Sequence, residues 1–253
     1  MRPSGLSGKR VLVTGAAGGI GQAVLRALLE EGMRVVATDL DPAAIPPAPN
    51  LRAERLDVTS SAEVDALVAR IEAEEGPIDC GVSLAGILAT DTVAQTTDES
   101  WRRVFAVNTD GVFHLGRALA RVMGPRAAGS IVVVSSNAAG VPRHAMAAYA
   151  ASKAATTMFT RCLGLELAPL GIRCNIVAPG STLTPMQTGM WADADGAARV
   201  IAGSPETYKA GIPLRKLATP EDIADAVAFL LSDRAGHITM ADLYIDGGAT
   251  LRG

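Results

Sequence analysis

The chain has 253 residues and a formal net charge of -3 at pH 7, with 49% hydrophobic and only 4% aromatic residues. The core must therefore consist mainly of Ala, Val, Leu and Ile, in a chain whose length is typical of one α/β domain. The absence of a basic surplus or a run of like charge argues against binding of nucleic acid or of an anionic membrane.

Targeting signals and metal-ligand patterns are also missing from the sequence. Residues 1–8 lack the apolar core of a signal peptide, so we expect a mobile tail on a cytoplasmic protein. No apolar stretch reaches membrane-spanning length without a charge or a helix breaker. Cys80, Cys162 and Cys174 are odd in number and widely spaced, which favours buried, reduced thiols over disulfides and predicts no metal site.

A strand, a glycine-rich turn, a helix and a second strand open the chain. The apolar run Arg10–Thr14 predicts the first strand, and Met33–Asp39 predicts the second. Helical spacing of apolar residues covers Gln22–Glu31 between them. This βαβ unit places glycines where a dinucleotide pyrophosphate can approach the backbone and the helix N-terminus. The predicted contacts are Gly15, Gly19, Ile20 and Gly21.

Asp39 ends the second predicted strand and indicates which nicotinamide cofactor is used. A carboxylate there would accept hydrogen bonds from both adenosine ribose hydroxyls and would repel a 2′-phosphate. Ala16 and Ala17 offer no cation for that phosphate. The sequence therefore favours NAD over NADP, with a simple loop carboxylate before Asp41-Pro42 as the alternative.

Strands and helices continue to alternate along the rest of the chain. The predicted elements are the strand Leu51–Leu56, the helix 62–75, the strand Ile78–Leu84, the helix 98–122, the strand Ile131–Val134, the helix 147–168, the strand Ile172–Val177, the helix Pro220–Ser232 and the strand Asp242–Ile245. This order predicts a Rossmann-type doubly wound parallel sheet with helices on both faces, in one domain over 1–253. The irregular segment 184–213 is expected to be a substrate lid, or else a variable surface excursion.

Tyr149 and Lys153 are four residues apart on a predicted helix, so their side chains share one face. An ammonium beside a phenol favours the phenolate and makes a general base. Ser136 lies at the carboxyl end of a predicted buried strand, where open α/β sheets bind ligands. The alternative is a core tyrosine near a solvated lysine. For Asn108, within a helix, solvent exposure is the ordinary explanation.

Taken together, the motifs of the chain resemble the short-chain dehydrogenase/reductase family. They are Thr14-Gly15-xxx-Gly19-Ile20-Gly21, Asp57-Val58, Asn108, Ser136, Tyr149-xxx-Lys153 and Pro179-Gly180-xxx-Thr184. The resemblance implies catalysis by Asn108, Ser136, Tyr149 and Lys153, with Asn108 anchoring a water, and a homotetramer. It also implies cofactor contacts by Asp57, Val58, Ala85, Gly86, Tyr149, Lys153, Pro179, Gly180, Thr182 and Thr184. Ser83-Leu84-Ala85-Gly86 departs from the usual Asn-Asn-Ala-Gly of the family, so side-chain bonding there is in doubt.

A narrower resemblance covers residues from about 101 to the end of the chain. The similarity is to family members that oxidise 2,3-dihydro-2,3-dihydroxybenzoate, and it is carried by Val141–Tyr149, Ile172–Val177, Pro179–Thr182, Pro185–Gln187 and Gly236–Met240. That resemblance implies NAD-dependent oxidation at C3 and aromatisation to a siderophore-type catechol. Alternatives are the same oxidation of 2,3-dihydro-3-hydroxyanthranilate, a 3-oxoacyl-type carbonyl reductase, and a non-enzymatic dinucleotide-binding regulator.

A carboxylated substrate requires a cation in the binding pocket. Arg143, six residues before Tyr149, is the candidate for a charge-assisted clamp, and a surface arginine is the alternative. Gln187 is predicted to bond a ring hydroxyl or the carboxylate. Met146, Met186 and Met190 would supply adaptable apolar walls, unless they belong to the core. Ser136 and Tyr149 complete the predicted substrate contacts.

Overall fold

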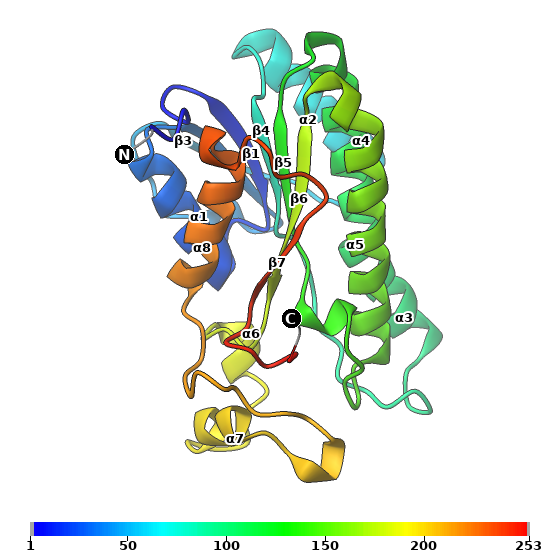
Figure 1. Ribbon diagram of the computed structural model, residues 1–253. Coiled ribbons are helices and arrows are strands. Elements are labelled where there is room, and N and C mark those ends of the chain that lie inside the picture. The colour runs from blue at the N-terminus through cyan, green and yellow to red at the C-terminus, as the bar shows by residue number, and fades with distance from the viewer. Residues whose placement is uncertain (1–2, 252–253) are drawn as a thin grey trace.

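A seven-stranded parallel sheet forms the centre of the computed structural model, which describes residues 3–251 (Figure 1). The strand order is β3-β2-β1-β4-β5-β6-β7, so the chain reverses direction across the sheet between β1 and β4. This confirms the predicted doubly wound fold, whose ligand site lies at that reversal. The strands are β1 Arg10–Thr14, β2 Arg34–Asp39, β3 Leu51–Arg55, β4 Cys80–Ser83, β5 Ser130–Val134, β6 Arg173–Pro179 and β7 Asp242–Ile245.

Helices cover both faces of the sheet (Figure 1). One face carries α1 (Gly19–Glu30) and α8 (Pro220–Leu231), and the other carries α2 (Ser61–Glu74), α4 (Gly111–Met123) and α5 (Ala147–Leu167). Alternate side chains of a strand point to opposite faces, so one strand supplies two cores. In β1, Val11 and Val13 join the core under α1 and α8, whereas Leu12 joins the core under α2, α4 and α5.

The remaining helices are short or interrupt longer ones. They are α3 (Asp98–Phe105), α6 (Pro185–Thr188), α7 (Gly196–Ala202), the π-helical η2 (Ala106–Asp110) and the 3-10 turns η1 (Pro42–Ala44), η3 (Gly124–Arg126), η4 (Asn137–Ala139), η5 (Ala168–Leu170), η6 (Pro205–Thr207) and η7 (Asp233–Ala235). The predicted helix 98–122 is therefore α3, η2 and α4 in succession.

Capping residues explain where the helices begin. Before α8, Thr219 and Asp222 form a capping box, in which the Asp222 N–H donates to Thr219 Oγ1 at 3.3 Å and the Thr219 N–H donates to Asp222 Oδ2 at 2.8 Å. Before α1, Gly18 provides no side-chain cap. The first N–H groups of α1 are therefore open to an external acceptor.

The N-terminal residues pack against the fold, which corrects the prediction of a mobile tail over 1–8. Leu6 is completely buried in the core under α1 and α8. The Asp233 N–H donates to the Ser4 carbonyl at 2.8 Å, and the Ser4 hydroxyl donates to Glu31 at 2.5 Å. A single apolar residue in a polar stretch is too little pattern to predict this packing. Residues 1–2 of the expected tail lie outside the described residues.

All three cysteines are free thiols, as predicted. Cys80 and Cys174 are buried, and burial raises the pKa of each thiol to about 12. Cys162 is exposed on α5, which corrects the expectation that it is buried. Across residues 3–251, no helix is both long and apolar enough to cross a bilayer.

The segment 184–213 extends past the carboxyl ends of the strands, where it holds α6 and α7 (Figure 1). It contributes no strand to the sheet, and its backbone makes mainly local contacts. An isolated antiparallel bridge joins Ser204 to Lys209. The segment therefore lies beyond the carboxyl edge of the sheet, and its role as a lid stays a prediction.

Candidate active site and cofactor cleft

A cavity of about 560 Å³ lies along the carboxyl ends of the strands. It runs from the glycine turn after β1, past the ends of β4, β5 and β6, to α5 and the segment 184–213. The predicted site residues that line it are Gly19, Ile20, Gly21, Gly86, Ser136, Arg143, Met146, Tyr149, Lys153, Pro179, Gly180, Thr182, Thr184 and Gln187. One continuous space thus joins the predicted cofactor, catalytic and substrate residues.

Six predicted residues lie outside that lining and support it from behind or from the side: Gly15, Asp39, Asp57, Val58, Ala85 and Asn108. Asp57 follows β3, and its Oδ1 accepts the Thr59 N–H at 2.9 Å and the Thr59 hydroxyl at 2.7 Å. These hydrogen bonds hold the pKa of Asp57 below its usual value. Val58 is buried, and a Cβ at Gly111 would lie 2.8 Å from its side chain.

The glycine turn fits a dinucleotide because its backbone is packed too closely for side chains. Gly15 has φ of +69°, and a Cβ there would lie 2.4 Å from the Ala85 nitrogen. A Cβ at Gly21 would lie 2.4 Å from the Gly15 carbonyl oxygen. The turn consequently brings bare backbone and the N–H groups of Gly19 and Ile20 to the cleft, a donor set suited to pyrophosphate.

Asp39 is hydrogen-bonded to the glycine turn, so it is not a free carboxylate in a loop. It ends β2, and its Oδ2 accepts the Ala17 N–H at 3.0 Å. The carboxylate therefore stands beside the bend of the turn, on the adenosine side predicted for it.

Lys153 is buried behind the cavity wall. Its Nζ donates to the Val134 carbonyl at 3.0 Å and lies 5.9 Å from the centroid of the Tyr149 ring. Burial lowers the pKa of Lys153 from 10.5 to about 8. The structure thus brings the two side chains together, as the four-residue spacing predicts.

Tyr149 and Ser136 face each other across the end of β5. Ser136 Oγ accepts the Ala138 N–H at 3.1 Å, which leaves its proton to donate to the phenol. Burial raises the pKa of Tyr149, and the hydrogen bond from Ser136 opposes that rise. Burial thus outweighs Ser136, and the lowered pKa predicted for Tyr149 relies on the cationic nicotinamide ring as well as on Lys153.

The buried ammonium makes stability depend on pH. Between pH 7 and 9, we expect the free energy of unfolding of the wild type to rise by about 1 kcal/mol relative to Lys153→Met. The unfolded chain retains the proton of Lys153 up to about pH 10.5, whereas the folded chain loses it near pH 8, so deprotonation favours folding. Urea unfolding at fixed protein concentration measures the difference. If the difference in the free energy of unfolding between the wild type and Lys153→Met stayed constant or shrank with rising pH, the prediction would be contradicted.

Asn108 is fully buried, which excludes the ordinary alternative of an exposed, solvated residue. Its side-chain Oδ1 accepts the Ile87 N–H at 2.8 Å, and its Nδ2 donates to the Ile87 carbonyl and to Ser152 Oγ, both at 3.0 Å. Ser152 Oγ in turn donates to the Tyr149 carbonyl at 2.7 Å. Asn108 therefore joins the loop after β4 to the first turns of α5.

The π-helical segment η2 places Asn108 at this junction. A π turn changes the backbone hydrogen-bond pattern of a helix locally, and such turns are frequent at functional sites. Here the Asn108 carbonyl accepts the Thr156 hydroxyl at 2.7 Å. A Cβ at Gly86 would lie 3.4 Å from Asn108 Oδ1 and 3.5 Å from Lys153 Nζ. The glycine therefore leaves room between the amide and the ammonium.

The departure at Ser83-Leu84 has a visible consequence in the structure. Ser83 pairs with Thr14 in the register of β4 and β1, and both are buried. The Thr14 hydroxyl has no hydrogen-bond partner among residues 3–251. Leu84 instead lines the cavity and packs against the core. The backbone of Leu84 and Ala85 keeps the close approach to Gly15 of the glycine turn, and Gly86 faces Asn108 and Lys153 instead.

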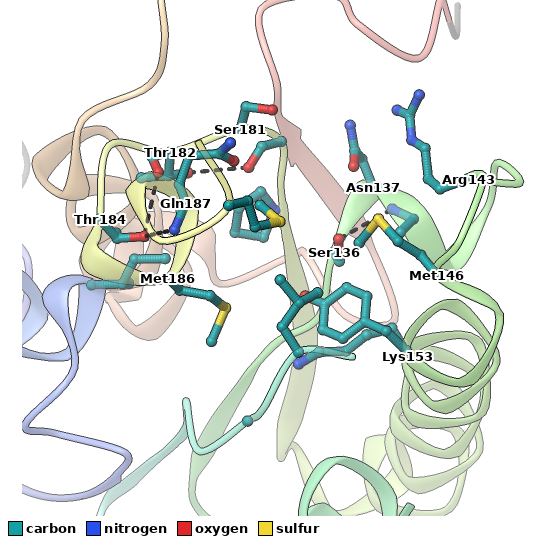
Figure 2. A pocket seen from close by; sticks show the side chains of 18 of the residues that line it. Ser136, Asn137, Arg143, Met146, Lys153, Ser181, Thr182, Thr184, Met186 and Gln187 are labelled. Atoms are coloured by element: carbon teal, nitrogen blue, oxygen red, sulfur yellow. Dashed lines mark hydrogen bonds between the residues drawn. The ribbon is translucent and has the colours of Figure 1, made fainter. Parts of the chain in front are cut away.

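Arg143 stands on one wall of the cavity with Met146, opposite Thr184 and Gln187 (Figure 2). Its guanidinium is half-buried, and this burial lowers its pKa while Asp246 raises it. Ala145, two residues on, adopts φ of +54°, a conformation that costs free energy in a residue other than glycine. This strained bend leads the loop into α5.

The methionines and Gln187 also reach the cavity. Met186 and Met190 line it and remain exposed to it, so they are not part of the core. Met146 precedes the first residue of α5, and the half-buried Gln187 belongs to α6. His144 is exposed at the cavity edge.

Lys209 is a lining residue that the sequence analysis did not identify. It lies in an irregular loop, with no motif or periodic spacing that relates it to Tyr149. The chain contains only four lysines, and two of them, Lys153 and Lys209, line this cavity. The scarcity of lysines is the one feature of the sequence that draws attention to Lys209, and it does not indicate where the side chain lies. Among residues 3–251, no cluster of three His, Cys, Asp or Glu side chains could hold a metal ion.

Comparison with known proteins agrees with this geometry. Residues 15–250 match a family model described as enoyl-(acyl carrier protein) reductase. The chain is 54% identical to the 2,3-dihydro-2,3-dihydroxybenzoate dehydrogenase of Bacillus subtilis (strain 168), over 99% of each chain. The chain belongs to the short-chain dehydrogenase/reductase family. Membership of this family implies a nicotinamide cofactor.

Two further members support the assignment over the whole length. The 2,3-dihydro-2,3-dihydroxybenzoate dehydrogenase of Escherichia coli (strain K12) is 43% identical over 97% of this chain and 98% of its own. The ligand-free structure of Thermoplasma acidophilum aldohexose dehydrogenase superposes with a TM-score of 0.87 at 30% identity, covering 100% of this chain and 98% of that one. The short-chain dehydrogenase/reductase fold thus extends over the segment 184–213 as well.

Proposed function

We propose that the protein oxidises the C3 alcohol of 2,3-dihydro-2,3-dihydroxybenzoate with NAD and releases 2,3-dihydroxybenzoate. The observation that carries this proposal is one cavity that joins the Ser136–Tyr149–Lys153 group to a cationic wall at Arg143. The relatives at 54% and 43% identity bear the name of this dehydrogenase, which supports the same substrate. The product is a catechol of the kind used in siderophores.

The catalytic residues have distinct roles in this proposal. Tyr149, as phenolate, accepts the proton of the C3 hydroxyl, and Ser136 donates a hydrogen bond to the reacting oxygens. NAD held in the cleft would supply the hydride acceptor for C3, and its positive charge would favour the phenolate of Tyr149. The proton on Tyr149 passes toward Lys153 and solvent, with Asn108 anchoring a water of this relay. Loss of the C2 proton from the resulting dienone then gives the aromatic ring, which makes the oxidation strongly downhill.

The remaining cofactor residues hold NAD in this scheme. Thr184 binds the carboxamide, Lys153 also holds the nicotinamide ribose, and Pro179, Gly180 and Thr182 shape the wall at the end of β6. Thr182 Oγ1 donates to the Gly180 carbonyl at 3.2 Å, which fixes this wall (Figure 2). Asp57, Val58 and Ala85 border the adenine side.

Asp39 sets the preference for NAD over NADP. We expect Asp39→Ala to lower kcat/KM for NAD by about tenfold and to improve the use of NADP, because the variant loses hydrogen bonds to the ribose and the repulsion of a 2′-phosphate. Initial rates with each cofactor measure both changes. A wild type that prefers NADP would contradict the assignment and would favour a 3-oxoacyl-type reductase.

The amine analogue 2,3-dihydro-3-hydroxyanthranilate is the second candidate substrate, because it differs only at C2. Formation of NADH, followed at 340 nm with each purified diene, distinguishes the two. We expect the diol to give the higher kcat/KM. A higher value with the amine would replace the proposed substrate while leaving the catalytic residues unchanged.

We also propose a cytoplasmic homotetramer with a lid over 184–213. Exposed apolar side chains on α4 and α5 support assembly: Phe113, Met158 and Leu165. The free thiols fit a reducing compartment. The position of the segment 184–213 beside the cavity supports its role as the substrate lid.

A further inference from the structure

Two cations reach the substrate end of the cavity from different parts of the chain. Arg143 comes from the loop between η4 and α5, and Lys209 comes from the end of the segment 184–213. Both side chains are half-buried, and both line the same space. A cavity wall that gathers two desolvated positive charges favours an anion between them.

Lys209 is directed toward the cavity by the loop that carries it. Its N–H donates to the Ser204 carbonyl at 3.0 Å, and its own carbonyl accepts the Ser204 N–H at 2.9 Å. Gly203 closes this loop at φ of +85°, where a Cβ would lie 2.5 Å from the Lys209 carbonyl oxygen. The side chain of Tyr208 is 97% exposed and points outward, whereas the next side chain, Lys209, points into the cavity.

Neither cation forms an ion pair within the described part of the chain. Among residues 3–251, no carboxylate pairs with Arg143 or Lys209. Asp246 is the acidic group that acts on Arg143, but its oxygens accept from Asn137, Gly248 and Thr250. Burial lowers the pKa of Lys209, and the charge of Arg143 lowers it further. The two side chains are therefore close enough to repel.

We propose that Lys209 is a second specificity residue, which binds the substrate carboxylate together with Arg143. The anion relieves the repulsion between the two cations and ties the segment 184–213 to the loop before α5. This inference takes the identity of the ring from the proposed function. The negative charge of the ligand follows from the two cations and does not depend on that function. It predicts discrimination between a carboxylate and a neutral group of similar size at the same position.

Binding of the product and its amide tests the proposal without turnover. Calorimetry on the protein saturated with NAD compares 2,3-dihydroxybenzoate with neutral 2,3-dihydroxybenzamide. We expect Lys209→Met to raise the Kd of the acid about tenfold and to leave that of the amide within about twofold. Lys209→Arg should restore most of the affinity. Lys216→Met, an exposed lysine outside the cavity, serves as the matched control.

Two further measurements separate this role from others. In the double variant with Arg143→Ala, the loss of acid affinity should be smaller than the product of the two single losses, because one carboxylate is shared. The Kd for NAD should not change. If Lys209→Met folds poorly, Lys209→Gln serves as a second variant, and its melting temperature shows whether it is folded.

Three results with Lys209→Met would overturn the assignment. The Kd of the acid could stay unchanged, or the Kd values of the acid and the amide could rise equally. A raised Kd for NAD would place Lys209 on a cofactor phosphate. Failure of the proposed function looks different. In that case the wild type would not oxidise the diol, yet it would still select acid over amide in a Lys209-dependent manner.

Discussion

Tyr149→Phe should lower kcat for oxidation of the diol by about 10³-fold, because general-base catalysis is worth about 10²–10⁴-fold. The substitution removes one oxygen atom and keeps the ring that packs beside Lys153. Stopped-flow or long-time assays of NADH formation measure the residual rate. Titration of NAD should give a Kd within about threefold of the wild type, since the glycine turn is unchanged.

Tyr208→Phe is the matched control for this variant. Tyr208 loses the same atom but is exposed and lies outside the cavity lining, so full activity is expected. If Tyr149→Phe retained wild-type activity, the base would have to be another residue, and the proposed mechanism would be wrong. If it lost NAD binding as well, the role of Tyr149 would be structural.

Arg143→Ala should raise KM for the carboxylated diol by about 10–100-fold, with kcat changed only a few-fold. A charged hydrogen bond is worth about 1.5–3 kcal/mol, and the half-buried site provides little water to replace it. Initial rates over a wide range of diol concentration measure both constants. The methyl ester of the diol should show a much smaller change in KM, since it carries no charge.

Arg103→Ala, an exposed arginine on α3, controls for loss of a surface charge. An unchanged KM in Arg143→Ala would move the carboxylate partner elsewhere in the cavity. An equal rise for acid and ester would indicate that Arg143 shapes the loop before α5 rather than binding the carboxylate.

The framework of the fold could be predicted because its elements are long apolar runs bounded by Gly, Pro and Asp. The predicted bounds of β1 and β7 match the structure to the residue. The spacing of Tyr149 and Lys153 likewise predicted their proximity. It could not predict the desolvation that raises the pKa of Tyr149 and lowers that of Lys153.

Features without periodicity could not be predicted. The burial of Asn108 is one of them, because nothing in its sequence neighbourhood indicates the π-helical turn that directs it inward. The packing of residues 4–8 combines the buried Leu6 with hydrogen bonds between Ser4 and distant residues, and neither produces a periodic pattern. Lys209 reaches the cavity through a closed loop whose shape depends on Gly203 and Ser204, not on any repeating pattern.

Transfer of deuterium from the substrate tests the central claim most directly. The diol labelled with deuterium at C3 is incubated with the purified protein and NAD, and the nucleotide and the ring product are analysed by mass spectrometry. Hydride transfer from C3 predicts one deuterium in the reduced cofactor and none in the 2,3-dihydroxybenzoate. Unlabelled NADH, or a labelled catechol, would contradict oxidation at C3.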